Sequence, residues 1–308
     1  MTISLKGRVA IVTGAGGGLG RSHALALAER GASVVVNDLG VERNGTALTN
    51  SAAENVAEEI RARGGDAISS TASVTDEKAV AAMIDAALTR WGRVDILVNN
   101  AGVLRDKTFA KMSLDDFRFV VDVHLMGSVI CTRAVWDLMR SQNHGRIIFT
   151  TSSSGLYGNF GQSNYAAAKM ALVGLMHTLH LEGARHGIRV NCLSPSAATR
   201  MTDDVYPEDL LQSLDPALVA QGVVALSSDD APSRLILCAG AGMFEAAHVT
   251  LTHGLHASDA GNAAEQILAR LDDVRARGGE VVPASGPEQA QLEAQKAATM
   301  TMRERATA

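Results

Sequence analysis

The chain begins with short apolar runs that alternate with longer stretches of helical periodicity. Continuous apolar runs without polar alternation are typical of strands that are buried on both faces of a sheet. We therefore predict six such strands, at residues 9–12, 34–36, 67–70, 96–98, 146–149 and 188–191.

Helical patterns fill the intervals between these strands. They predict helices at roughly residues 19–30, 51–63, 76–91, 114–140 and 164–185. Strand–helix repetition of this kind produces a parallel sheet with right-handed crossovers and helices on both faces. The predicted fold class is therefore α/β, a doubly wound Rossmann-type parallel sheet in a single domain over residues 1–250.

The pattern changes after about residue 250. Residues 261–277 combine helical periodicity with alternating charge, and residues 287–308 are rich in Ala, Gln, Glu and Met. We predict that residues 251–308 form a C-terminal helical extension or tail. A surface helix with a partly ordered tail and a contact with a partner subunit both fit this composition, so the sequence leaves the role of the extension open.

Charge and hydropathy argue against two classes of partner. Charged residues make up 20% of the 308 residues, and the net charge of −5 is spread along the chain, so no basic surface for nucleic acid is expected. No apolar run approaches the length of a membrane span. We expect a chain that binds neither nucleic acid nor a membrane.

The cysteines argue against metal and disulfide chemistry. Cys131, Cys192 and Cys238 are far apart, and no Cys/His cluster with metal-ligand spacing accompanies them. Isolated thiols fit a reducing compartment, and residues 1–7 run into the first strand without room for a cleavable signal. We therefore expect no metal site and a cytoplasmic location.

A glycine-rich turn connects the first predicted strand to the first helix. Residues 13–20 have the sequence Thr-Gly-Ala-Gly-Gly-Gly-Leu-Gly. Glycine lets the backbone approach a pyrophosphate closely, and unpaired N–H groups at a helix N-terminus favour negative charge. Such a turn could instead only pack a helix on a sheet, but its place in an α/β repeat favours a dinucleotide. The predicted contacts are Gly14, Gly16, Gly18, Leu19 and Gly20.

Asp38 follows the second predicted strand and bears on the choice of cofactor. A carboxylate at this position accepts hydrogen bonds from the adenosine ribose hydroxyls and repels a 2′-phosphate. We therefore predict NAD as the cofactor. The alternative, that Asp38 only begins a loop, stays open, and the nearby Arg43 leaves room for NADP.

Three polar side chains in the second half of the domain fit alcohol chemistry. Ser152 ends the fifth predicted strand, and Tyr165 precedes Lys169 by four residues on a predicted helix, so both can face one cleft. A phenol with a pKa near 10 is a poor base at neutral pH, but a neighbouring ammonium favours the phenolate. We predict Tyr165 as acid/base, with Ser152 donating a hydrogen bond to the substrate oxygen.

These motifs together resemble the short-chain dehydrogenase/reductase family over roughly residues 5–195. A closer resemblance is to the (3R)-hydroxyacyl-CoA dehydrogenase domains of type 2 multifunctional enzymes, also called type 4 17β-hydroxysteroid dehydrogenases. It is carried by residues 36–40, 102–106, 123–127, 155–162 and 207–210. The resemblance implies an NAD-dependent oxidoreductase that acts on a (3R)-hydroxyacyl-CoA, including a steroid-derived acyl-CoA.

The resemblance also extends the set of site residues. Further cofactor contacts are Ser73, Val74, Asn99, Asn100, Ala101, Gly102, Tyr165, Lys169 and Pro195. The substrate side comprises Leu156, Tyr157, Asn159, Gln162 and Met201, although several of these could equally pack the start of a helix. The two long helices would form the contact of a homodimer or homotetramer.

His124 departs from the wider family, which has Asn at this point of the long helix. The closer subfamily carries His here. A ring nitrogen can accept and donate a proton, so we predict that His124 links Lys169 to solvent. The alternative is a buried helix histidine with one hydrogen bond.

Three other functions stay open. The first two are a 17β-hydroxysteroid dehydrogenase acting on free steroids and a 3-oxoacyl-carrier-protein reductase using NADPH. The third is an NAD-binding sensor without turnover. The intact Ser152, Tyr165 and Lys169 argue against the sensor, and Asp38 argues against NADPH. The sequence gives neither the exact substrate nor the direction of the reaction.

Overall fold

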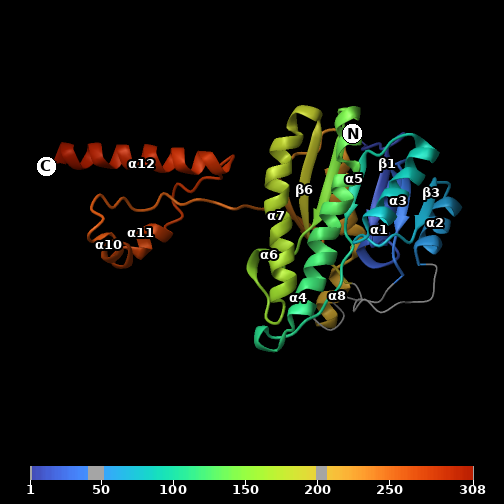
Figure 1. Ribbon diagram of the computed structural model, residues 1–308, viewed down its shortest axis with the longest axis horizontal. Coiled ribbons are helices and arrows are strands. Elements are labelled where there is room, and N and C mark those ends of the chain that lie inside the picture. The colour runs from blue at the N-terminus through green and yellow to red at the C-terminus, as the bar shows by residue number, and fades with distance from the viewer. Residues whose placement is uncertain (1, 41–51, 199–206, 308) are drawn as a thin grey trace. The chain divides into compact units, whose positions relative to one another are not determined.

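A central parallel sheet organises the protein, seen here in a computed structural model that describes residues 2–40, 52–198 and 207–307. Its order is β3-β2-β1-β4-β5-β6-β7-β8, with β8 antiparallel to β7 and all other pairs parallel. Figure 1 labels β3, β1 and β6 of this sheet. The strands are β1 Val9–Thr13, β2 Ser33–Asn37, β3 Ala67–Ser70, β4 Ile96–Asn99, β5 Gly145–Thr150, β6 Ile188–Ser196, β7 Ile236–Gly240 and β8 Met243–Ala247. The predicted fold class is confirmed.

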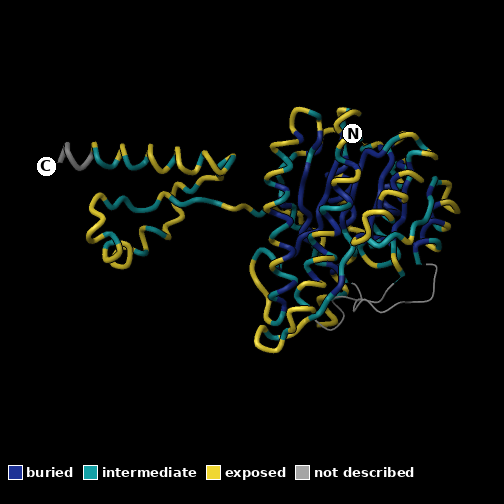
Figure 2. Tube along the Cα trace, in the orientation of Figure 1, coloured by how far each residue is buried: buried dark blue, intermediate teal, exposed yellow. Residues whose placement is uncertain are grey.

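Helices cover both faces of this sheet. They are α1 Gly18–Glu29, α2 Ala52–Ala62, α3 Glu77–Trp91, α4 Leu114–Val121, α5 Gly127–Gln142, α6 Ser153–Tyr157, α7 Ser163–Gly183, α8 Glu208–Ser213 and α9 Pro216–Ser227. Helices α1, α2 and α9 enclose one apolar cluster, and α3, α5 and α7 enclose the other. Buried residues therefore follow the strands and the inner helix faces (Figure 2).

The predicted helix over residues 114–140 is interrupted. A π-helical segment, Asp122–Met126, separates α4 from α5 and carries His124. The whole stretch Leu114–Gln142 is long and apolar enough to cross a membrane by length and composition, contrary to our expectation from the sequence. Its Cys131, Val135 and Met139 are fully buried against the sheet, as in the core helix of a globular domain.

Two strands at the far edge of the sheet lie beyond those we predicted. Strand β7 continues the parallel order, and β8 returns antiparallel to it. The side chains of β8 are exposed from Met243 to Ala246. An exposed strand lacks the buried apolar run on which our prediction of strands depended.

Residues His248–Ala308 form a compact unit separate from Met1–Ala247. This C-terminal unit contains α10 Ala263–Ala269, α11 Leu271–Arg275 and α12 Gly286–Thr307, so the predicted helical stretch at 261–277 is divided in two. Leu251 and Val281 form an antiparallel bridge, and the Lys296 ammonium donates to the Thr252 carbonyl. No residue between 248 and 302 is buried.

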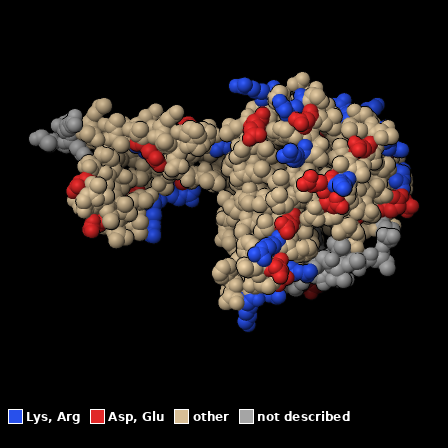
Figure 3. Space-filling model, in the orientation of Figure 1, with Lys and Arg blue, Asp and Glu red and all other residues tan. Residues whose placement is uncertain are grey.

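The surface carries charges of both signs. On the face shown in Figure 3, Lys and Arg alternate with Asp and Glu rather than forming a patch of one sign. Many of the charged side chains are paired, as Arg21 is with Glu59 and Arg90 with Asp66. Within the ranges that the structure describes, no group of three His, Cys, Asp or Glu residues has the arrangement of a metal site.

Candidate active site

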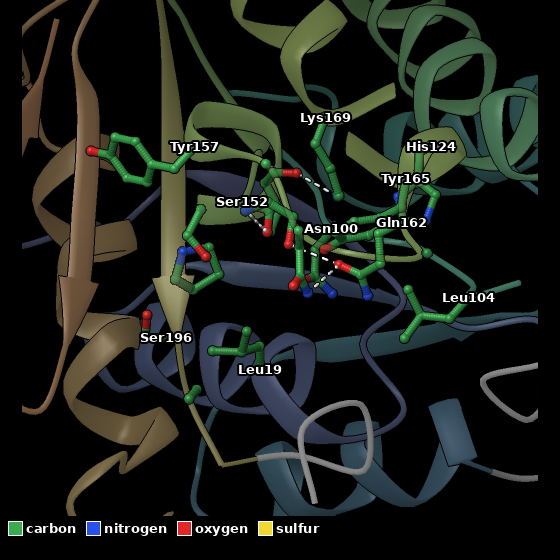
Figure 4. Close-up of a pocket in the computed structure, with 18 residues that line it drawn as sticks. Leu19, Asn100, Leu104, His124, Ser152, Tyr157, Gln162, Tyr165, Lys169 and Ser196 are labelled. Carbon is green, nitrogen blue, oxygen red and sulfur yellow. Dashed lines mark hydrogen bonds between the residues drawn. The ribbon is translucent and has the colours of Figure 1, made fainter. Parts of the chain in front are cut away.

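The carboxyl ends of the central strands open into a cavity of about 330 Å³. It is lined from α1, from the segments after β4, β5 and β6, and from α7. Ser152, Tyr165 and Lys169 all lie on its wall (Figure 4). The edge where β1 and β4 end side by side is where open α/β sheets bind ligands.

The glycine-rich turn forms a close-fitting backbone cradle between β1 and α1. Gly14 has a φ of +65°, which favours glycine, and a Cβ there would lie 2.8 Å from the Cα of Ala101. A Cβ on Gly20 would lie 2.0 Å from the Gly14 carbonyl oxygen. The N-cap residue Gly17 supplies no side-chain hydrogen bond to the first turn of α1. These features fit a bound pyrophosphate, which would accept from the first N–H groups of the helix.

Asp38 lies beside this cradle at the end of β2. Its carboxylate accepts from the backbone N–H groups of Gly16 and Gly40, each at 2.8 Å. A Cβ on Gly16 would lie 2.8 Å from the Asp38 carboxyl carbon, so the carboxylate is held directly against the turn. The neighbouring Arg43 lies outside the described residues.

The turn after β4 is tied to the turn after β1. The Asn100 side chain donates to the carbonyl oxygens of Thr13 and Gly14, both at 3.1 Å. The Thr13 hydroxyl accepts from the backbone N–H groups of Asn100 and Ala101. These bonds hold the two turns together at the floor of the cavity.

Ser152 is the N-cap of α6, and this role determines what its hydroxyl can do. Its Oγ accepts from the Ser154 N–H at 3.1 Å. The hydroxyl hydrogen is not used in that bond, so Ser152 can still donate it to a substrate oxygen.

Tyr165 and Lys169 lie one turn apart on α7. The Lys169 ammonium lies 5.5 Å from the centre of the Tyr165 ring and donates to the Thr150 carbonyl at 2.5 Å. Lys169 is 3% exposed, and its burial lowers the pKa from 10.5 to about 7.

His124 is packed against this pair from the π-helical segment. Its ring meets the Tyr165 ring edge-on with centroids 5.1 Å apart. The Nε2 atom lies 2.8 Å from the Val103 carbonyl oxygen, and Nδ1 is buried without a hydrogen-bond partner among the described residues. Burial, then the Lys169 charge, hold the pKa well below 6.5, so the ring is neutral.

Other predicted site residues divide into two groups. Leu19, Tyr157, Asn159, Gln162 and Pro195 line the cavity together with Asn100 and Gly102. Several others are not among its lining residues. Leu156 packs against an apolar cluster, and the Asn99 side chain donates to the Thr132 hydroxyl. Val74 packs on Gly127, and the Ser73 hydroxyl forms a hydrogen bond with the Thr75 hydroxyl. Met201 lies outside the described residues.

Three further residues shape the site but were not among the predicted site residues. Thr13 joins the two turns, and Ser154 lines the cavity. Asn164 is fully buried and donates to the Arg105 carbonyl at 3.1 Å, directly beside Tyr165. Only the position of Asn164 next to Tyr165 could have drawn attention to it in the sequence.

The glycine turn and the group of Ser152, Tyr165 and Lys169 lie at one edge of a parallel sheet, an arrangement that fits an oxidoreductase. The chain belongs to the short-chain dehydrogenase family, whose model, described as short chain dehydrogenase, matches residues 8–209. The predicted family and enzyme class are confirmed.

Two curated relatives are similar over most of the chain. A peroxisomal multifunctional enzyme type 2 from mouse is 51% identical over 220 residues, which are 71% of this chain and 30% of that protein. A putative short-chain type dehydrogenase/reductase from Mycobacterium tuberculosis is 45% identical over 280 residues, which are 91% of this chain and 95% of that protein. The chain thus spans less than a third of the mouse enzyme.

Two solved structures have the same fold. Full-length peroxisomal multifunctional enzyme type 2 from Drosophila melanogaster has a TM-score of 0.80 at 35% identity, covering 97% of this chain and 51% of that one. A 7α-hydroxysteroid dehydrogenase complexed with NADH and 7-oxo glycochenodeoxycholic acid has a TM-score of 0.70 at 31% identity, covering 78% and 95%.

The relatives correct one expectation. Those from mouse, Drosophila melanogaster and Saccharomyces cerevisiae are named peroxisomal enzymes, which contradicts the cytoplasmic location that we expected. Isolated thiols respond to the redox state around a protein. They do not distinguish one compartment with reduced thiols from another, so the three cysteines could not show that the location is the cytoplasm.

Proposed function

We propose that this chain is an NAD-dependent dehydrogenase that interconverts a secondary alcohol and a ketone, with a (3R)-hydroxyacyl-CoA as substrate. The observation that carries the proposal is the meeting of Ser152, Tyr165 and Lys169 on one cavity wall beside the glycine cradle. The mouse and Drosophila relatives are named peroxisomal multifunctional enzyme type 2, and the sequence resembles the (3R)-hydroxyacyl-CoA dehydrogenase domains of type 2 multifunctional enzymes, which supports a substrate of this class. Steroid-derived acyl-CoA esters belong to the same class.

Tyr165 is the residue that transfers the proton. In the direction of oxidation its phenolate oxygen takes the hydroxyl proton, while Ser152 donates a hydrogen bond to the same substrate oxygen. When bound, the nicotinamide accepts the hydride from carbon. The nearby Lys169 favours the phenolate, because a positive charge lowers the pKa of a phenol.

A route for the proton continues from Tyr165 through Lys169 to His124. His124 Nε2 lies 3.1 Å from the Val103 backbone nitrogen and 2.8 Å from the Val103 carbonyl oxygen, and these two contacts hold the ring in place. The buried Nδ1 atom beside Tyr165, which has no partner among the described residues, can form a hydrogen bond with a water molecule that carries the proton outward. His124 is neutral and therefore acts by hydrogen bonding rather than by its charge.

Asp38 supports NAD rather than NADP. The carboxylate lies against the cradle, where a ribose 2′-phosphate would meet its negative charge. The solved 7α-hydroxysteroid dehydrogenase was complexed with NADH, which agrees with this choice. We also propose a homodimer or homotetramer, because exposed Met170 and Leu181 lie on one side of the long helix α7.

The test is turnover with a small substrate panel, followed through the absorbance of the reduced nicotinamide. The panel contains (3R)- and (3S)-hydroxyacyl-CoA esters and a free hydroxysteroid, each with NAD and with NADP. We expect turnover of the (3R)-ester with NAD. The similarity to a hydroxysteroid dehydrogenase makes a free steroid the second candidate substrate. Turnover of the free steroid alone would contradict the proposal of an acyl-CoA substrate. A preference for NADP would overturn the role of Asp38.

A further inference from the structure

Gln162 occupies a central place in the cavity wall that the proposed reaction does not use. It precedes Tyr165 by three residues, at the N-cap of α7, so the two side chains lie on one face of the helix. Gln162 is 7% exposed and lines the cavity with Ser152 and Tyr165 (Figure 4).

The amide of Gln162 has three hydrogen-bond partners. Its Oε1 accepts from the Ser154 hydroxyl at 2.9 Å and from the Asn159 side chain at 3.0 Å. Its Nε2 donates to the Asp106 carboxylate at 2.7 Å. Asp106 lies on the segment after β4, which is also held by a bond from the Lys107 N–H to the Gly161 carbonyl.

Asp106 alone determines which way the amide faces. A serine hydroxyl and an asparagine amide can each donate or accept, so Ser154 and Asn159 would tolerate either orientation of Gln162. An ionised carboxylate only accepts, and it therefore requires the NH₂ group on its side. The Asp106 side chain lies at the exposed end of this network.

One N–H group of Gln162 is left over. The two acceptor positions of Oε1 are filled and one hydrogen of Nε2 points to Asp106, while the second hydrogen has no partner among the described residues. A buried N–H without a partner is unfavourable, and an acceptor oxygen on a ligand in the cavity would satisfy it. Tyr165 and Ser152 already account for the reacting oxygen of an alcohol.

We propose that Gln162, oriented by Asp106, binds a carbonyl oxygen two carbons from the reacting hydroxyl and so selects 3-hydroxyacyl thioesters over simple secondary alcohols. Gln162 is the binding residue, and Asp106 is a positioning residue that acts through it. This inference rests on the proposed function and assigns part of its substrate specificity to a residue pair.

The experiment compares two substrates that differ only in that oxygen. One is a (3R)-hydroxyacyl-CoA thioester, and the other is the thioether in which a CH₂ group replaces the carbonyl. The ratio of their kcat/KM values is measured for the wild type, Gln162→Met and Asp106→Ala. Asp115→Ala serves as the control, because Asp115 is an exposed carboxylate on α4 that pairs with Arg118.

We expect Gln162→Met and Asp106→Ala to lower the thioester-to-thioether ratio by roughly three- to tenfold, the usual value of one hydrogen bond. The loss should appear mainly as a higher KM for the thioester, while the control keeps the wild-type ratio. Asp106 is exposed, so its alanine variant folds even if Gln162→Met does not.

The outcomes distinguish a failure of this inference from a failure of the proposed function. If the wild type turns over the thioester and Asp106→Ala keeps the wild-type ratio, Gln162 does not act in this way, and the proposed function stands. If the wild type fails to turn over the thioester with either nucleotide, the proposed function and the inference both fail.

Discussion

Burial makes the charge of Lys169 sensitive to pH near neutrality. The folded pKa is about 7 against a reference value of 10.5, so between these values the unfolded chain binds a proton that the folded chain does not. Stability from this group therefore rises with pH across that window and is lowest below it. A lysine on the surface would show no such dependence.

This argument predicts a difference between the wild type and Lys169→Met in urea unfolding without cofactor. From about pH 7 to pH 9 the free energy of unfolding of the wild type should rise relative to the variant, by up to about 1.4 kcal/mol per pH unit. Parallel curves for the two proteins would show that Lys169 keeps an ordinary pKa in the folded state.

Asp38 gives a second prediction for a single residue. We expect Asp38→Ala to lower the ratio of kcat/KM with NAD to that with NADP by at least roughly tenfold, because ribose hydrogen bonds are lost and the repulsion of the 2′-phosphate disappears. Asp137→Ala, which removes an exposed carboxylate paired with Arg140, should leave the ratio unchanged. An unchanged ratio in Asp38→Ala would remove the argument for NAD.

At the scale of elements, the π-helical segment and the turn after β4 depend on each other. A Cβ on Gly102 would lie 2.3 Å from the Cε1 atom of His124, so only glycine permits the ring to lie where it does. We expect Gly102→Ala to destabilise the protein by about 1–3 kcal/mol through overpacking. Thermal unfolding measures the effect.

A double variant shows whether the ring is the cause. In a His124→Ala background, the Gly102→Ala change should cost less than about 0.5 kcal/mol, because the clashing atoms are gone. An equal cost in both backgrounds would mean that Gly102 matters for another reason.

The buried elements could be predicted from the sequence because burial leaves a pattern. Strands β1, β2 and β4 are continuous apolar runs, and their ends were predicted to within a residue or two. Strand β8 is exposed, so it carries no such run. The π-helical segment differs from an α-helix in its hydrogen bonds and not in its residues, so the sequence could not show it.

The candidate site was predictable where one motif carries a whole function. The glycine turn and the spacing of Tyr165 and Lys169 belong to single segments. Thr13 and Asn164 were missed because each acts by a bond to a distant segment, Thr13 to Asn100 and Asn164 to Arg105. Gln162 was predicted to line the cavity, but its orientation depends on Asp106, which is 56 residues away.

At the scale of the whole molecule, the two units differ in their cores. Met1–Ala247 contains both apolar clusters, whereas no residue from 248 to 302 is buried. A segment without a core buries too little apolar surface to offset the conformational entropy that it loses on folding. We propose that residues 1–250 are the catalytic domain and that residues 251–308 depend on contacts outside their own unit.

This division predicts how fragments of the chain behave. A chain ending at Ala247 should keep the helical circular dichroism of its domain and bind NAD with an affinity within roughly threefold of the full chain, a difference below about 0.7 kcal/mol. A peptide of residues 248–308 should be largely unfolded alone. Cooperative unfolding of that peptide would contradict the prediction.

The central claim is that the cavity beside the glycine cradle performs acid/base chemistry through Tyr165. The most direct test is single-turnover oxidation of a (3R)-hydroxyacyl-CoA by Tyr165→Phe, with NAD affinity measured in parallel. We predict a rate at least about a hundredfold below that of the wild type, the usual contribution of a general acid/base, with NAD affinity unchanged. Turnover at the wild-type rate would show that Tyr165 is not the proton-transfer group and that the reaction runs elsewhere.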